Sequence, residues 1–171
     1  RRDQVMEMME GFVRHFWKTM LNSDVPPIQR MTYRDAMEKY GIDRPDTRYD
    51  LFITDLSELA SKMDFKVFQD ALAKGKARPR FNSKRGVVNA LRVPGGADKL
   101  TRKITDGYSE LVKPFGAGGV AVVKCIKGED GGPKLDTGIA KFLEPHKAAF
   151  MAAVGAQIGD TILFVADAYS I

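Results

Sequence analysis

The 171-residue sequence is poor in the side chains that most often form metal or disulfide sites, with one cysteine and two histidines. Because Cys125 is alone, no disulfide can form within the chain. Its place in the apolar run VAVVKCI predicts a buried strand residue in a reducing compartment. His15 and His146 have no second ligand at metal spacing. We therefore expect no metal site.

Long apolar runs are also lacking. No window approaches the ~18 apolar residues that a membrane span needs. The sequence opens on Arg1-Arg2-Asp3 and an amphipathic segment, which does not resemble a signal peptide. We expect a cytoplasmic protein without membrane contact. Because there is no initiator Met, we also expect a piece of a longer chain.

Catalytic motifs are missing as well. The sequence contains no P-loop, no dinucleotide fingerprint, no G-x-S-x-G and no H-E-x-x-H string. The glycine-rich strings PGG, GAGG and GEDGG are explained as turns. We therefore expect no catalytic residue, and no bound cofactor or metal, in this chain.

The sequence does contain alternating helical and strand patterns. An apolar stripe at helical spacing predicts a first helix with a core-facing side: Val5, Met9, Phe12, Val13, Phe16 and Met20. Thr32 and Asp35 form a capping box for a helix over 33–40, which Gly41 ends. Further helices are predicted over 101–115 and 145–154, and strands over 65–68, 87–93, 119–126, 139–143 and 161–166. The pattern is typical of an α+β fold, with one mixed or antiparallel sheet and helices on one face.

Positive charge is concentrated in residues 74–103. This basic segment has ten basic residues against one acid, Asp98, for a charge of +9, while the rest of the chain carries −4. Such a local field attracts a phosphate backbone, although a solvated loop is the plainer interpretation. The candidate RNA-backbone contacts are Arg78, Arg80, Lys84, Arg85, Arg92, Arg102 and Lys103.

The string GIDR, residues 41–44, matches the end of motif 3 in class II aminoacyl-tRNA synthetases, where an arginine binds ATP from the start of a helix. Here Lys39 replaces the first glycine of that motif. Pro45 disfavours the helical region for Arg44. The sequence therefore predicts a helix cap and a turn at this place.

Longer stretches carry a family resemblance. Residues 30–51, RMTYRDAMEKYGIDRPDTRYDL, resemble a segment of bacterial-type aspartyl-tRNA synthetases. NALRVPGGADKLTRK, KPFGAGGVAVVKC and GIAKFLEP resemble the inserted GAD domain of those enzymes, and GDTILFVAD resembles the return to the catalytic domain. The resemblance implies three parts: a flank of the catalytic domain (1–61), a GAD-like insertion (62–160) and a return strand (161–171).

The resemblance also implies what the parent enzyme does. It would activate aspartate with ATP and Mg²⁺ and transfer it to tRNA(Asp), as a cytoplasmic homodimer. Motif 2, motif 3 and the anticodon-binding barrel would lie outside this chain, so the fragment alone would be inactive.

Several alternatives stay open at this point. Asp43, Arg44, Asp46 and Arg48 could fix a turn by pairing with one another, or Arg44 or Arg48 could reach the active site or tRNA. The chain could instead be a stand-alone RNA-binding or adaptor module that uses the basic segment. It could also be the GAD-like domain of a tRNA-dependent amidotransferase B subunit, against which the match over 30–51 argues. Whether the parent also charges tRNA(Asn) is open.

Overall fold

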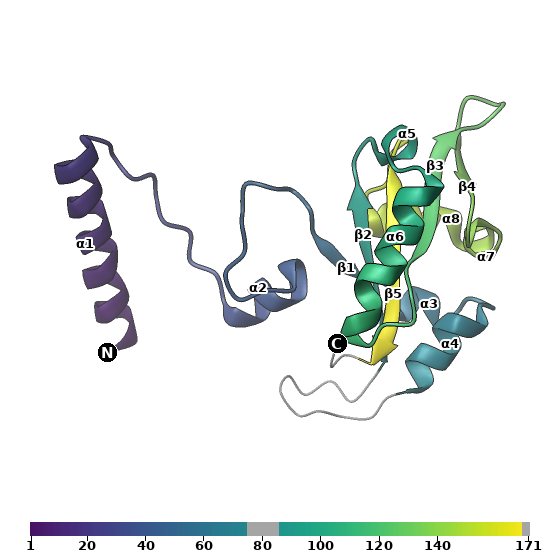
Figure 1. The fold of residues 1–171 in the computed structure, drawn as a ribbon, viewed down its shortest axis with the longest axis horizontal. Coiled ribbons are helices and arrows are strands. Elements are labelled where there is room, and N and C mark those ends of the chain that lie inside the picture. The colour runs from purple at the N-terminus through teal and green to yellow at the C-terminus, as the bar shows by residue number, and fades with distance from the viewer. Residues whose placement is uncertain (75–85, 169–171) are drawn as a thin grey trace. The chain divides into compact units, whose positions relative to one another are not determined.

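The computed structural model describes residues 1–74 and 86–168 (Figure 1). The chain separates into two compact units, residues 1–35 and 36–171. No helix of the described ranges is long and apolar enough to cross a membrane.

The first unit is built on one long helix. Helix α1 (Arg2–Leu21) confirms the predicted helix and ends at Asn22, which has a left-handed φ of 47°. Its apolar stripe is not buried, since Phe12 is 61% and Met20 is 65% exposed. The prediction that the stripe packs in a core is therefore wrong within this unit. The reason is that one helix and an extended segment provide no second layer against which to bury it.

Helix α2 (Tyr33–Tyr40) begins at the capping box predicted from the sequence. The Thr32 hydroxyl accepts a hydrogen bond from the Asp35 backbone N–H at 3.0 Å and donates one to the Asp35 carboxylate at 2.7 Å. Gly41 ends the helix with a φ of 73°. Both ends of this helix are thus confirmed.

The second unit contains a five-stranded antiparallel sheet, which confirms the α+β class. Its strands are β1 (Ile53–Asp55), β2 (Gly86–Val93), β3 (Ala121–Lys127), β4 (Pro133–Asp136) and β5 (Thr161–Ala168), in the order β1-β2-β5-β3-β4. Strand β5 pairs with β2 along all eight of its residues and with β3 on its other side. Residues 161–168 of the predicted return strand therefore lie in the middle of the sheet (Figure 1).

The hydrophobic core lies on one face of this sheet. Val88, Val123, Ile162 and Phe164 point to that face and are at most 1% exposed. They pack against residues of four helices: α3 (Ser57–Ala60), α4 (Lys66–Ala73), α7 (Ala140–Leu143) and α8 (Lys147–Val154). The predicted layer of helices on one face is thus present.

Two further helices lie on the other face of the sheet. Helix α5 (Gly96–Lys99) packs so closely on it that a Cβ added at Gly96 would lie 3.0 Å from Thr161 Cβ. Helix α6 (Arg102–Val112) follows, continued by the short 3-10 helix Lys113–Phe115 and ended by Gly116. The helices thus cover both faces, which the sequence did not predict.

Two predicted strands are wrong. Residues 65–68 begin helix α4, and Phe65 and Phe68 meet on one side of it with ring centroids 4.8 Å apart. Residues 139–143 form helix α7, whose Phe142 packs on Phe65 at 4.6 Å. Short apolar runs fit either period, so their tertiary neighbours decide between helix and strand.

Candidate functional site

The turn after α2 lies between Gly41, which ends that helix, and strand β1. It contains the four candidate turn or active-site contacts: Asp43, Arg44, Asp46 and Arg48. Gly41 donates to the Met37 carbonyl at 3.0 Å, and residues 41–44 form a bend rather than the start of a helix. Asp43 and Arg44 are exposed, and neither forms an ion pair within the described ranges. This backbone does not present Arg44 in the way that motif 3 presents its arginine.

Asp46 and Arg48 contact each other in this turn. The Arg48 Nε donates to Asp46 Oδ1 at 2.9 Å, and the Arg48 backbone N–H donates to the same oxygen at 3.0 Å. The Arg48 side chain lowers the pKa of the Asp46 carboxyl to about 2, and Asp46 in turn raises the pKa of Arg48. This pairing supports the structural interpretation of the turn.

Arg92, a candidate RNA contact, forms an internal ion pair. Its Nε donates to Asp160 Oδ2 at 2.6 Å. The Asp160 carboxylate is buried and also accepts hydrogen bonds from the backbone N–H groups of Gly95 (3.0 Å) and Gln157 (2.8 Å). Burial raises the pKa of Asp160, but these three hydrogen bonds outweigh it and lower the pKa overall. Asp160 thus ties the turn after β2 to the turn before β5, and Arg92 is its cationic partner.

The other nine basic residues of the segment divide into three groups. Lys74 is exposed and its ammonium donates to Asp167 Oδ1 at 3.2 Å. Lys76, Arg78, Arg80, Lys84 and Arg85 lie outside the described residues. Lys99, Arg102 and Lys103 are exposed around the junction of α5 and α6. The Arg102 side chain is 95% exposed and lies 3.8 Å from Asp106. These three cations lie close together in the chain and are open to an external ligand.

A groove opens beside this junction, and we call it the α6–β3 groove. It is lined by Leu100 and the first turns of α6, by residues 120–122 and Lys124 at the start of β3, and by the turn 137–139. Its volume is about 480 Å³. Arg102, Lys124 and Asp106 are its charged lining residues. Lys124 is not among the contacts predicted from the sequence. The signal was available, because a lysine interrupts the apolar run VAVVKCI.

The turn that closes this groove has an unusual backbone. Thr137 has a φ of 66°, which is rare for a β-branched residue. Gly138 follows with a φ of 52°, and a Cβ added there would lie 2.0 Å from the Val122 carbonyl oxygen. Only glycine fits this contact, so the turn is held tightly against β3.

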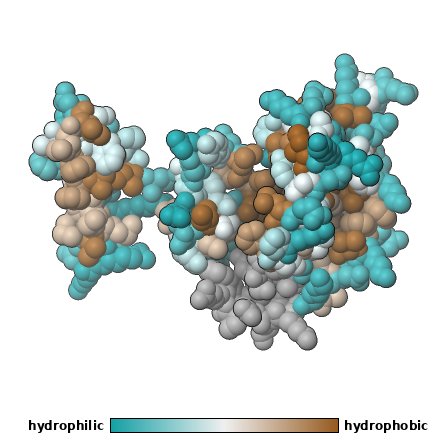
Figure 2. Space-filling view, in the orientation of Figure 1, coloured by the Kyte–Doolittle hydropathy of each residue, from teal (hydrophilic) through white to brown (hydrophobic). Residues whose placement is uncertain are grey.

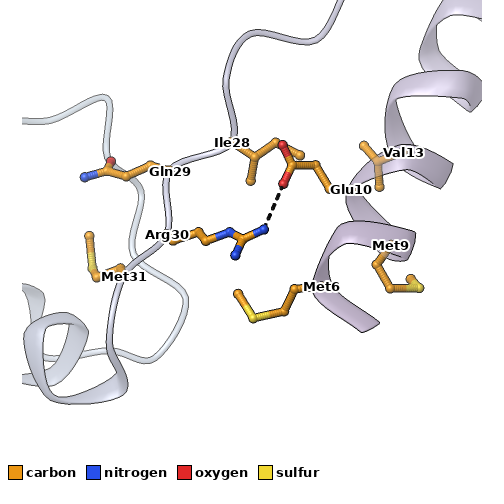
Figure 3. Close-up of a pocket in the computed structure, with 8 residues that line it drawn as sticks. All are labelled: Met6, Met9, Glu10, Val13, Ile28, Gln29, Arg30 and Met31. Atoms are coloured by element: carbon orange, nitrogen blue, oxygen red, sulfur yellow. Dashed lines mark ion pairs between the residues drawn. The ribbon is translucent and has the colours of Figure 1, made fainter. Parts of the chain in front are cut away.

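A second groove lies in the first unit, between α1 and the segment that follows it (Figure 3). Its volume is about 360 Å³, and its lining includes Met6, Met9, Ile28 and Met31. The Arg30 guanidinium crosses it to Glu10 at 3.6 Å. Figure 2 shows apolar residues gathered along this helix. The lining of this groove is therefore better suited to packing against an apolar surface than to catalysis.

The described residues contain neither a cluster of metal ligands nor a reactive thiol. In residues 1–74 and 86–168, no group of three or more His, Cys, Asp or Glu side chains could hold a metal ion. Burial raises the pKa of the Cys125 thiol, and nearby Asp160 raises it further. This thiol is therefore held in its unreactive, protonated form.

Comparison with known proteins identifies the part of the chain that contains the α6–β3 groove. Residues 80–171 match the family model of the GAD domain. The chain belongs to the GAD domain family. The groove, the Arg92–Asp160 pair and strands β2 to β5 all lie within the GAD domain.

The similarity to known proteins extends beyond the GAD domain. The chain is 43% identical over 172 residues to the aspartate–tRNA ligase of Macrococcus caseolyticus, an alignment that covers 99% of this chain and 26% of that protein. It is 39% identical to that of Halalkalibacterium halodurans, over 97% of this chain and 26% of that protein. It is 40% identical to the aspartate–tRNA(Asp/Asn) ligase of Nitratidesulfovibrio vulgaris, over 96% of this chain and 24% of that protein. The chain thus spans about a quarter of the length of these relatives.

Proposed function

We propose that this chain is part of an aspartate–tRNA ligase. One observation carries the proposal: the similarity to such ligases covers 99% of the chain, whereas the GAD domain model covers only residues 80–171. The flank before residue 80 therefore supports a synthetase rather than another protein that carries a GAD domain, such as an amidotransferase subunit. A stand-alone RNA-binding module does not explain this flank either.

In the proposed parent enzyme, aspartate attacks ATP to give aspartyl adenylate and pyrophosphate, and the acyl group then passes to the 3′ end of tRNA(Asp). Mg²⁺ and cationic side chains would stabilise the phosphate charge in the first step. The described residues do not fit an ATP–Mg²⁺ site, because they contain no metal-ligand cluster and Arg44 lies in a bend. We assign that site, and the contacts of a cytoplasmic homodimer, to parts of the parent beyond these residues.

The division of the parent into domains is also a proposal. We place the catalytic-domain flank at 1–61, the insertion at 62–160 and the return at 161–171. The pairing of β5 with both β2 and β3 favours counting β5 with the insertion. The pairing of β1 with β2 favours the same for residues 53–55.

Contact between the GAD domain and RNA is a second, compatible proposal. Lys99, Arg102 and Lys103 are exposed near one another in the chain. Arg78, Arg80, Lys84 and Arg85 stay candidates for the same contact. Arg92 is a weaker candidate, because its Nε is already bonded to Asp160. Real phosphate contacts require the logarithm of the affinity for tRNA to fall steeply with the logarithm of the salt concentration, and a flat dependence would exclude them.

Aspartate-dependent ATP–pyrophosphate exchange tests the main proposal. We expect exchange from the full-length protein and none above background from the 171-residue chain in a folded sample. Exchange with another amino acid in place of aspartate would refute the assignment. Because one relative is named for both tRNA(Asp) and tRNA(Asn), the full-length protein should be assayed for charging of each.

A further inference from the structure

The charged lining of the α6–β3 groove has two cations, Lys124 and Arg102, against one carboxylate, Asp106. Lys124 is partly buried in its lining, and its ammonium donates to the backbone carbonyl of Ala97. Within the described part of the chain it forms no direct ion pair with a carboxylate, although Asp136 of β4 lies opposite it in the strand register. The Lys124 ammonium is held by a neutral carbonyl and not by a direct ion pair, so it can attract an anion that enters the groove.

The other polar groups of the groove fit the same kind of ligand. Arg102 adds a second cation at the rim, against the single carboxylate of Asp106. Thr137 contributes a hydroxyl group to the lining, whereas the Thr105 hydroxyl already donates to the Arg102 carbonyl at 2.9 Å. Two cations with a hydroxyl donor beside them form a typical set of contacts for phosphate oxygens.

The size and rigidity of the groove suit a ligand larger than a bare ion. Its volume of about 480 Å³ lies within the usual range of small-molecule sites. Val120, Val122 and Ile139 give it an apolar wall. The Gly138 contact with the Val122 carbonyl fixes the turn on the far side, so the groove does not need to form on binding.

We propose that the α6–β3 groove binds a phosphate group, with Lys124 and Arg102 as its cationic contacts. The phosphate could belong to a free mononucleotide or to the backbone of single-stranded RNA. The inference rests on residues of the GAD domain alone. A chain that binds no phosphate could still be part of an aspartate–tRNA ligase, and the exchange assay would show it.

Titration of the ¹⁵N-labelled 171-residue chain followed by NMR tests the proposal. The probes are inorganic phosphate, AMP and a single-stranded uridine pentanucleotide. We expect all three to shift the amide signals of Thr105, Val122 and Thr137, and to compete with one another. Tighter binding of the pentanucleotide than of AMP identifies RNA as the source of the phosphate, and the reverse order identifies a free nucleotide.

Charge variants make the test specific to these side chains. We expect Lys124→Ala and Arg102→Ala each to weaken binding by about tenfold, the loss of one charge-assisted contact. Lys124→Arg keeps the charge and should retain binding. Asp106→Asn removes the only lining carboxylate and should strengthen binding by roughly twofold to threefold. The matched control is Lys66→Ala, because Lys66 is an exposed lysine of α4, a helix that packs on the opposite face of the sheet.

Two results would overturn the proposal. One is the absence of groove shifts with every probe. The other is binding that Lys124→Ala and Arg102→Ala leave unchanged, or that Lys66→Ala weakens equally. If Lys124→Ala fails to fold, Arg102→Ala still gives the answer, because its side chain is 95% exposed.

Discussion

At the scale of single residues, the buried carboxylate of Asp160 is important for stability. It accepts three hydrogen bonds that join the turn after β2 to the turn before β5. Asp160→Asn should lower the free energy of unfolding by about 2–4 kcal/mol, because it weakens a buried charged network and leaves Arg92 unpaired. Urea denaturation measures this loss. Asp98→Asn, at an exposed acid of α5, is the control and should change little.

The same carboxylate gives the stability a pH dependence. The pKa of Asp160 is lowered in the folded state, so its ionised form stabilises the fold at pH values above the ordinary Asp pKa of about 4. That contribution is lost as the pH falls through the lowered pKa. Denaturation midpoints between pH 7 and pH 2 should therefore fall more for the wild type than for Asp160→Asn. Parallel curves for the two proteins would contradict this assignment.

Gly138 is the second residue whose identity the structure fixes. A Cβ there would overlap the Val122 carbonyl oxygen, at 2.0 Å, and the φ of 52° disfavours other residues. Gly138→Ala should therefore destabilise the chain by about 2 kcal/mol or more. Gly118→Ala is a matched control, because nothing lies within 4 Å of its added Cβ. Thermal unfolding of the two variants compares them, and equal losses would refute the close contact.

At the scale of elements, the loss of a phenylalanine should lower stability little on α1 and strongly on α8. Phe12 is 61% exposed on α1, whereas Phe150 on α8 is 0% exposed. In the 171-residue chain, Phe12→Ser should change the free energy of unfolding by less than about 0.5 kcal/mol, and Phe150→Ala should lower it by about 3–5 kcal/mol. Chemical denaturation tests both. A large loss from Phe12→Ser would mean that α1 is buried in solution.

Local signals predicted the elements that carry their own start and stop residues. The Thr32–Asp35 box and Gly41 defined α2, and Gly116 ended the α6 region as predicted. The strand predictions over 65–68 and 139–143 failed where partners decide. Phe65 packs on Phe142, 77 residues away in the sequence, and no local pattern reveals that contact.

The candidate site shows the same limit at the scale of side chains. Charge density singled out residues 74–103, but it could not show that Arg92 pairs with Asp160, 68 residues later. Nor could it show that Lys124 and Arg102 line one groove, because β3 and α6 come together only when the chain folds. The sequence shows that these cations are present, but only the folded structure determines which of them a ligand can reach.

At the scale of the whole molecule, the family assignment and the exposed helix are consistent with each other. The chain spans about a quarter of the length of its relatives, and α1 has no buried residue. We expect the apolar stripe of α1 to become protected from solvent in the full-length protein. Hydrogen–deuterium exchange of α1 amides in the short chain and in the full-length protein measures this. Equal exchange rates in the two would contradict the expectation.

The central position of β5 has a consequence for how the second unit is made. Phe164 of β5 pairs with Ala90 of β2 and with Ala121 of β3, so the two outer pairs of strands are joined only through β5. The ribosome synthesises β5 after the other four strands, so the five-stranded sheet cannot be completed before then. Such late, non-local pairing slows folding and leaves unpaired strand edges exposed in the nascent chain. During synthesis, this unit should therefore depend on chaperones until β5 emerges.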